Sequence, residues 1–310
     1  MNWVVRAKIQ NAIDRLPSAL SYAVYYRLQR MYGELKNIDP IGRFLPGVET
    51  WKRIRQCGHD PAGKTFFEVG TGRVPMVPLA YWLMGAERTV TMDINPYVKE
   101  ELVAECLQRI AGNRLKIEEL FGPLLVRERL DSLIELQESG RAGLREVMDL
   151  SRVDYRAPAN AAATGLVDGS IDYHTSYNVL EHIPPGALQD VFREGNRILA
   201  GDGLFVHRID YSDHFAHSDR SISAVNFLKY SDAEWDKLAG NKYMYMNRLR
   251  HDDIVGLLEA IGHHLLVDEP DVDRMIGDIL RNGQLTVHER FKNKSASVLA
   301  ATSAWIVSRK

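Results

Sequence analysis

A short stretch near residue 65 constrains the fold of this chain more than any other feature. Thr65–Val69 is an apolar, β-favouring run that stops at Gly70-Thr71-Gly72. A helical stretch follows from about Met76 to Met84, and a second strand, Thr89–Met92, ends at Asp93. A strand, a glycine turn, a helix and a second strand that ends in an acid are typical of an α/β fold with a parallel sheet.

The strand pattern continues after a long helical segment. Residues 97–151 are helical and charged, and they are longer than one crossover helix requires, so they indicate a crossover with an inserted helical hairpin. The further strands are expected near residues 152–154, 170–176, 204–209, 265–267 and 298–307. The prediction is an α/β, Rossmann-like, doubly wound sheet of seven mostly parallel strands.

Two further regions flank this sheet. Residues 1–60 predict a helical cap, and residues 61–310 would form the main domain, with an aromatic-rich lid at 211–250. Packing of the cap against the main domain is the favoured interpretation. A weak contact with a membrane surface is the alternative, because Trp3 sits at the tip of a locally basic amphipathic helix.

Composition excludes several classes of protein. The 39 Lys and Arg against 41 Asp and Glu give a net charge of -2, which argues against a broadly basic nucleic-acid binder. Cys57 and Cys106 fit no disulfide scaffold and no thiolate zinc site. The longest apolar stretch, residues 74–86, is only about 13 residues and contains two prolines, so no membrane span is expected. With no secretory pattern at the start, the sequence predicts a cytoplasmic protein.

The glycine turn and the acid after it point to an adenosine ligand. Glycines after the first strand let the backbone approach a ligand closely, and an acid about 20 residues further on can accept hydrogen bonds from both ribose hydroxyls. A dinucleotide site would need a third glycine where Pro75 stands, and proline removes an N–H that would hold the pyrophosphate. A phosphate-free ligand such as S-adenosylmethionine tolerates this proline.

Four segments taken in order carry a family resemblance: Glu68–Gly72, Asp93, Asp168–Asp172 and Asn178–Ile183. They resemble the class I S-adenosylmethionine-dependent methyltransferases. The resemblance covers roughly residues 64–209 and is weaker from residue 252 onward. It departs from the family at Val74, where a third alternating glycine is common, which leaves the shape of the methionine-end loop open. Residues 227–250 also resemble bacterial methyltransferases that serve sugar or cell-surface polysaccharide pathways.

The resemblance implies a cofactor site made of Glu68, Gly70, Thr71, Gly72, Asp93, Ile94, Asp154, Tyr155 and Asn178. In it, the glycines would line the amino-acid end of the cofactor, and Glu68 would anchor its ammonium directly or through water. Asp93 would hold the ribose beside Ile94, Asp154 or Tyr155 would border the adenine, and Asn178 would lie near the methionine. The alternatives are a solvated strand residue for Glu68, a helix N-cap for Asp93 and a turn residue for Asp154.

Transfer of a methyl group from a sulfonium is an in-line displacement, and an oxygen or nitrogen acceptor that loses a proton needs a base. The catalytic candidates lie on or just after the strands nearest the expected methyl: His182, His207, Asp210 and His214. In the family His182 more often braces its loop, whereas His207 and Asp210 could form a base and its orienting partner. The substrate-binding candidates are His217, Arg248 and Arg250. For the arginines, salt bridges to the helical insertion are the alternative.

No metal ligands are assigned, although a divalent metal is a competing possibility. Asp210, Asp213, His214 and His217 are suitable donors, but their spacing matches no specific motif. The function expected from the resemblance is O-methylation of a small molecule or sugar with S-adenosylmethionine, releasing S-adenosylhomocysteine. The rivals are a nicotinamide-dependent oxidoreductase, which Pro75 disfavours, and an idle methyltransferase-like scaffold, which the complete pocket disfavours. Protein or RNA acceptors and the oligomeric state stay open.

Overall fold

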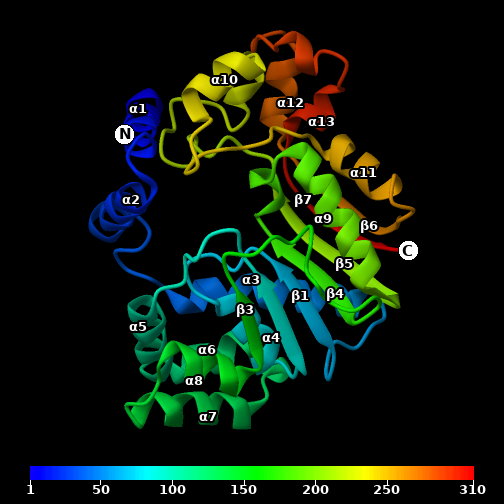
Figure 1. Cartoon of the computed structure of the whole chain (residues 1–310). Coiled ribbons are helices and arrows are strands. Elements are labelled where there is room, and N and C mark those ends of the chain that lie inside the picture. The colour runs from blue at the N-terminus through cyan, green and yellow to red at the C-terminus, as the bar shows by residue number, and fades with distance from the viewer.

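The computed structural model describes residues 1–310, and its centre is a seven-stranded sheet (Figure 1). The strand order is β3-β2-β1-β4-β5-β7-β6. β7 runs antiparallel to β5 and β6, and the other paired strands are parallel. The strands are β1 (Thr65–Val69), β2 (Arg88–Met92), β3 (Val153–Arg156), β4 (Ile171–Tyr177), β5 (Leu199–Asp210), β6 (His264–Val272) and β7 (Ala301–Arg309). The sheet confirms the predicted fold class.

The strand order reverses between β1 and β4. From β1 the chain moves outward to β2 and β3, and from β4 it moves in the other direction to β5. β1 and β4 pair in parallel through Phe66, Phe67 and Glu68, so their carboxyl ends open at the same edge. Such a switch point leaves a crevice between the two outgoing loops, which is where open α/β sheets bind their ligands.

One face of the sheet carries the helices from the first half of the chain. These are α3 (Pro40–Gln56), α4 (Met76–Leu83), α5 (Glu100–Ala111), α6 (Arg114–Phe121), α7 (Arg127–Glu138) and α8 (Leu144–Ser151). Trp51 of α3 stacks on Phe66 of β1, and Phe66 stacks on Tyr81 of α4. The last part of the expected cap therefore packs directly on the sheet. Between β2 and β3, α5 to α8 account for the predicted helical insertion.

The other face is covered by α9 (Pro185–Ile198) and α11 (His251–Glu259). Phe192 of α9 and Leu258 of α11 share one apolar cluster with Phe205 of β5. No helix connects β3 to β4, and the loop between them packs its alanines against Phe67 and its neighbours. Both faces are thus covered, so the central strands β1 and β4 are buried along most of their length, polar residues included.

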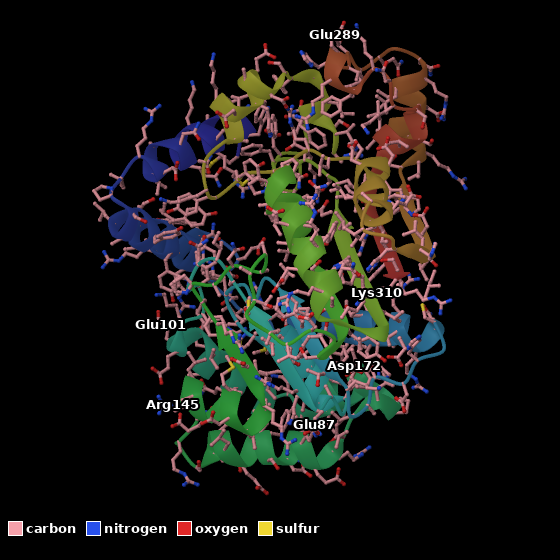
Figure 2. All side chains as sticks on the ribbon, turned by 45° about the vertical axis from the view of Figure 1, so that its right-hand side comes forward. Glu87, Glu101, Arg145, Asp172, Glu289 and Lys310 are labelled. Atoms are coloured by element: carbon pink, nitrogen blue, oxygen red, sulfur yellow. The ribbon has the colours of Figure 1, made fainter.

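The predicted lid is a second packed unit at the far end of the molecule from the amino-terminal edge of the sheet. Figure 2 shows this separation: Glu289 of the lid region lies at the top, and Glu87 and Asp172, which precede β2 and begin β4, lie low. The lid contains η3 (Asn226–Lys229), α10 (Asp232–Ala239), α12 (Arg274–Arg281), η4 (Glu289–Phe291) and α13 (Ala296–Ala300). It has its own apolar core around Phe227 and Trp235. The lid therefore takes in residues after 250 as well as those expected.

The first helix, α1 (Trp3–Asp14), packs on this lid rather than on the sheet. Trp3 is buried, its ring centroid lies 5.4 Å from that of Phe215, and its backbone N–H donates to Asp219 Oδ2 at 2.8 Å. The expectation that Trp3 could reach a membrane surface is therefore wrong. On the same helix, Val5 and Ile9 are exposed. No helix in the structure combines the length and apolar character that crossing a bilayer requires.

The second helix, α2 (Ser18–Tyr32), joins the lid to the sheet (Figure 1). On one side Ser21 Oγ and Tyr243 OH of the lid share a hydrogen bond of 2.6 Å. On the other side Tyr22 OH donates to Asn95 Oδ1, just after β2, at 2.8 Å. One helix thus contacts both the loop that follows the ribose-binding candidate Asp93 and the lid.

Candidate active site

The glycine turn after β1 holds the two central loops close together. Gly70 has φ +86° and its N–H donates to Met92 O at 2.8 Å. A Cβ on Gly70 would lie 2.6 Å from Cγ2 of Val179, which follows β4. Glycine is therefore required here for both backbone conformation and space, because any side chain would push apart the ends of β1 and β4.

Gly72 faces open space and is tied to the acid after β2. Its φ is +71°, and no atom lies within 4 Å of the position that a Cβ would take. Its N–H donates to Asp93 Oδ2 at 3.0 Å, and Asn95 N–H donates to Asp93 Oδ1 at 3.0 Å. Each carboxylate oxygen can accept a second hydrogen bond, so Asp93 can still receive two hydroxyls. Burial raises the pKa of Asp93.

Glu68 lies beneath this turn and is only 3% exposed. Thr91 Oγ1 donates to Glu68 Oε2 at 3.2 Å, and Thr91 Oγ1 shares a hydrogen bond of 2.7 Å with Thr71 Oγ1. Burial raises the pKa of Glu68 to about 8, so the side chain is mostly protonated at neutral pH. The alternative of a solvated strand residue is wrong, because the side chain is buried and is linked to the glycine turn through two threonines.

The start of α4 is poorly suited to phosphate. A pyrophosphate needs free N–H groups in the first turn of the helix. Pro75 and Pro78 have none, and the N–H of Met76 already donates to Val74 O at 2.9 Å. Among residues 75–78, only Val77 has a backbone N–H that is neither missing nor already donated to Val74. The donors present fit a phosphate-free nucleoside and do not fit a dinucleotide.

The remaining residues of the expected cofactor site divide into two groups. Ile94 is 74% exposed directly beside Asp93, and Asn178 is exposed at the end of β4 with φ +53°. Both can therefore meet a ligand in the crevice. Tyr155 is half-buried against the core on the helix-rich face, so only part of it is accessible.

Asp154 does not reach the crevice. It pairs with Arg88, at the start of β2, at 2.6 Å and with Arg156 at 2.8 Å, and these contacts lower the pKa of Asp154. It also lines an open depression at the amino-terminal edge, together with Thr65 and Arg88. The expectation that Asp154 borders the adenine is wrong. Ala159 takes a place nearer the crevice, since its N–H donates to Asp93 O at 2.9 Å.

His207 is a core residue. It is fully buried on β5, where its Nδ1 shares a hydrogen bond of 2.8 Å with Ser176 Oγ and its ring lies against Phe192. Burial, together with nearby His174, lowers the pKa of His207 well below the usual value. The expected catalytic role is wrong, because no substrate can reach a ring packed between the sheet and α9.

The two arginines expected to bind substrate instead brace the lid. Arg250 is fully buried and donates to the carbonyls of Tyr211, Leu299 and Ala301. Arg248 is also buried; it donates to Tyr230 O at 2.8 Å and pairs with the Asp232 carboxylate. The hydrogen bonds of both guanidinium groups go to the protein itself, so the structure does not support the prediction of substrate-binding arginines. The proposed alternative, salt bridges to the helical insertion, is wrong as well.

The structure brings the other polar candidates together beyond the ends of β4 and β5. Asp210 Oδ2 lies 3.4 Å from His214 Nε2 and 3.7 Å from His217 Nε2. The ring centroids of His182 and His214 are 4.9 Å apart. Although burial opposes it, the nearby His214 and hydrogen bonding from Ser212 lower the pKa of Asp210 to about 2. Asp210 therefore remains a carboxylate that can orient an imidazole.

His182 has one ring nitrogen fixed. Its Nδ1 lies 2.8 Å from the backbone oxygen of Tyr245, a pure acceptor, so Nδ1 carries the proton and Nε2 keeps its lone pair. Protein atoms crowd the ring although part of the side chain is exposed. This desolvation, together with nearby His214, lowers the pKa of His182. A neutral imidazole with a free lone pair can accept a proton or bind a metal.

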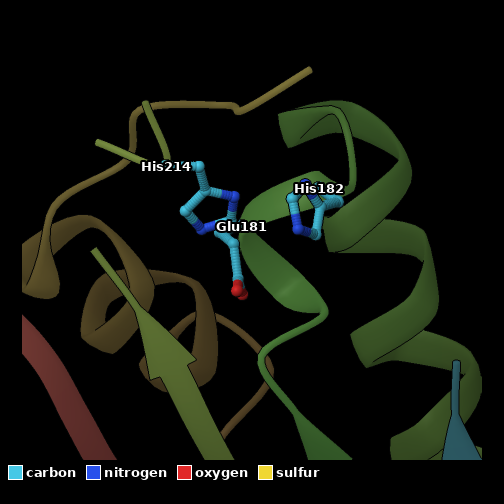
Figure 3. A group of neighbouring side chains, drawn as sticks. All are labelled: Glu181, His182 and His214. Carbon is cyan, nitrogen blue, oxygen red and sulfur yellow. The ribbon is translucent and has the colours of Figure 1, made fainter. Parts of the chain in front are cut away.

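Glu181 is the residue of this group to which the sequence assigned no role. It precedes His182 in η2 (Leu180–His182), and Asn247 N–H donates to Glu181 O at 2.8 Å. Its carboxylate is buried beside His182 and His214 (Figure 3). Asp213, in contrast, turns away and accepts from Phe215 N–H at 2.9 Å. The sequence signal was present, since Glu181 lies within the resemblance, but only the fold shows what it faces.

Comparisons with known proteins concern the fold. No protein-family model matches the sequence, and no curated protein matches it either. An S-adenosylmethionine dependent methyltransferase from Mesorhizobium loti is 15% identical, with 86% of this chain and 100% of that chain covered and a TM-score of 0.45. The geranyl diphosphate C-methyltransferase from Streptomyces coelicolor A3(2), crystallised with Mg2+, geranyl diphosphate and S-adenosyl-L-homocysteine, is 9% identical, with coverages of 84% and 77% and a TM-score of 0.45.

The (4+2)-cyclase SpnF is 14% identical, with 85% of this chain and 81% of that chain covered, and its TM-score is also 0.45. Because a fold of this kind hosts many activities, the function of this chain has to be argued from its own side chains.

Proposed function

We propose that this protein is an S-adenosylmethionine-dependent methyltransferase that methylates a hydroxyl group of a small molecule or sugar. One observation carries the proposal: at the switch point, Gly72 leaves open space beside a carboxylate that already holds its N–H. The neighbouring start of α4 lacks the free N–H groups that a phosphate requires. This combination favours a nucleoside without phosphate over a dinucleotide.

Five residues would hold the cofactor. Asp93 accepts hydrogen bonds from the ribose hydroxyls with its remaining lone pairs, and the exposed side chain of Ile94 packs on the adenine. Gly70 and Gly72 let the backbone approach the amino-acid end. Glu68, beneath the turn, supplies a negative charge for the ammonium once its proton has left. When bound, S-adenosylmethionine supplies a methyl group on a positively charged sulfur, from which in-line transfer occurs.

The acceptor would lie on the side of the crevice formed by the ends of β4 and β5. There His214 can take the proton of a hydroxyl, and the Asp210 carboxylate, 3.4 Å from its Nε2, stabilises the resulting imidazolium. His182 offers a second neutral imidazole, with Nε2 free. Such a base contributes about 10²–10⁴-fold in rate. The lid, whose sequence resembles enzymes of sugar and polysaccharide pathways, would cover the acceptor.

Binding measurements test the cofactor. By isothermal titration we expect S-adenosylhomocysteine to bind and NAD not to bind. Asp93→Ala should weaken S-adenosylhomocysteine binding by about tenfold to 150-fold for each ribose hydrogen bond lost, because hydrogen bonds to a charged group contribute about 1.5–3 kcal/mol each. Asp190→Ala, at an exposed position on α9, serves as the control and should leave binding unchanged. Preferential binding of NAD would favour an oxidoreductase, and binding of neither compound would indicate an idle scaffold.

Activity measurements test the acceptor and the base. Methyl-labelled S-adenosylmethionine is incubated with hydroxyl-bearing small molecules and sugars, and transfer of label to oxygen is the expected result. His214→Ala should lower the rate by about 10²–10⁴-fold without changing the affinity for S-adenosylhomocysteine. Label found only on nitrogen or carbon acceptors would contradict O-methylation while leaving the cofactor assignment intact.

A further inference from the structure

Glu181, His182 and His214 form a cluster that base catalysis alone does not explain (Figure 3). Each offers one ligand atom, and these atoms lie within 4.8 Å of one another. Glu181 is 3% exposed, and neither of its carboxylate oxygens has a hydrogen-bond partner. A buried carboxylate without a donor is costly unless a cation or a proton compensates it.

No cation forms an ion pair with Glu181. Asp210, whose Oδ2 lies 3.4 Å from His214 Nε2, raises the pKa of Glu181 after burial does, and the charge of Arg208 opposes this without contacting the carboxylate. Glu181 makes no salt bridge with any lysine or arginine. Two carboxylates and two imidazoles thus lie close together, and no lysine or arginine contacts the buried carboxylate of Glu181.

The imidazoles are arranged as metal ligands commonly are. The bond from His182 Nδ1 to Tyr245 O fixes the tautomer and leaves Nε2 directed away from the backbone. A backbone carbonyl or carboxylate on the other ring nitrogen is the usual support of a metal-bound histidine. His214 Nε2 is likewise buried and makes no hydrogen bond, although Asp210 lies near it.

The geometry points to a binding site for a first-row divalent transition metal, of the zinc class, held by Glu181, His182 and His214. Two imidazoles and one carboxylate are a common ligand set for zinc and for non-haem iron, whereas Mg²⁺ and Ca²⁺ prefer oxygen ligands. Three ligands about 2.0–2.2 Å from a tetrahedral ion stand roughly 3.3–3.6 Å apart, so the side chains need to close by up to about 1.5 Å from the present limit of 4.8 Å. Three protein ligands leave a fourth position for an oxygen ligand.

This site does not rest on the proposed methyltransferase activity, since the ion would bind in the absence of any cofactor. It does limit that activity. An ion would occupy the lone pairs of His182 and His214, so a given imidazole can serve as a ligand or as a base but not as both at once. The metal-free and metal-loaded forms should therefore differ at the acceptor side of the crevice.

Cobalt binding gives a readout independent of activity. Chelator-treated protein is titrated with Co²⁺ while its visible absorption is followed, and Zn²⁺ is then added as a competitor. We expect one Co²⁺ per chain, visible bands of an imidazole- and carboxylate-bound ion, and their loss when Zn²⁺ displaces it. Absence of the bands in the wild-type chain would overturn the inference, and so would competition by millimolar Mg²⁺.

Variants locate the site. His214→Ala and Glu181→Gln should each weaken Co²⁺ binding by about 100-fold or more. Loss of a residue that only supports a metal ligand already lowers metal affinity by up to about 100-fold, and loss of a ligand itself should cost at least as much. His264→Ala is the matched control, because His264 is exposed at the start of β6 and belongs to no such cluster. Thermal unfolding without metal verifies that each variant is folded. Equal affinity in wild type and both ligand variants, or an equal loss in His264→Ala, would place the ion elsewhere and refute the assignment.

Discussion

The raised pKa of Glu68 predicts that binding of the proposed cofactor releases protons, and this release can be measured. Burial raises the pKa of Glu68 to about 8 in the ligand-free chain, so about 90% of the molecules carry the proton at pH 7. Pairing with the ammonium of the ligand requires the carboxylate. Binding of S-adenosylhomocysteine should therefore release about 0.9 proton at pH 7, and its affinity should rise nearly tenfold per pH unit between pH 5.5 and 7, or ~1.4 kcal/mol per unit.

The assay is isothermal titration in two buffers of different ionisation enthalpy, because the difference in observed heat gives the number of protons released. Glu68→Gln should release almost none and should bind with little dependence on pH. Glu135→Gln, at an exposed position on α7, should behave like the wild type. Release of less than about 0.2 proton by the wild type at pH 7 would refute the reasoning, because Glu68 would then not be both protonated in the free chain and paired in the complex.

Three further predictions concern stability. Gly70→Ala should lower the free energy of unfolding, measured in urea, by about 2–4 kcal/mol, because φ is positive there and the new Cβ would lie 2.6 Å from Val179. Adding Val179→Ala should recover part of the lost stability, and no recovery would contradict a steric clash with Val179. Arg250→Met should lower the free energy of unfolding by about 3–5 kcal/mol and leave KM unchanged, because it removes the buried hydrogen bonds to the carbonyls of Tyr211 and Leu299. A raised KM in a fully stable variant would instead show that Arg250 binds substrate. Burial lowers the pKa of His174 to about 3, below its unfolded value, so its contribution to stability is complete above about pH 6.5 and should fall by up to ~1.4 kcal/mol per pH unit as the pH drops toward 3. Urea unfolding between about pH 4 and 7 should show a weaker dependence of the free energy of unfolding on pH for His174→Phe than for the wild type. An unchanged dependence would exclude this residue as its cause.

The part of the site that the sequence predicted is local in the chain. Thr65–Val69, the glycine turn and Asp93 span fewer than thirty residues, and a parallel pairing of two strands joined by one helix leaves little freedom in where the turn and the acid meet. The positive φ of Gly70 and of Gly72 and the contact of Gly72 with Asp93 follow from that arrangement. This is why the sequence alone predicts that the glycine turn and Asp93 lie together at the end of β1 and β2.

The errors arose where a side chain's role depends on its position within a strand or on distant partners. His207 is only three residues from the end of β5, yet its side chain points into the layer under α9, and sequence alternation cannot tell which face is closed when both are buried. Asp154 sits in the middle of the register of β3 with β2, not beyond its end. Arg250 finds its acceptors near residues 298–301, about fifty positions away.

The bridging helix α2 has a mechanical consequence. Tyr22 hydrogen-bonds to Asn95 in the loop after β2, and Ser21 hydrogen-bonds to Tyr243 in the lid, so one helix connects the lid to the sheet. If the proposed nucleoside moves the Asn95 loop, α2 would transmit that movement to the lid through Ser21 and Tyr243. Binding of the cofactor and enclosure of the acceptor would then be coupled through one helix that lies outside both proposed binding sites.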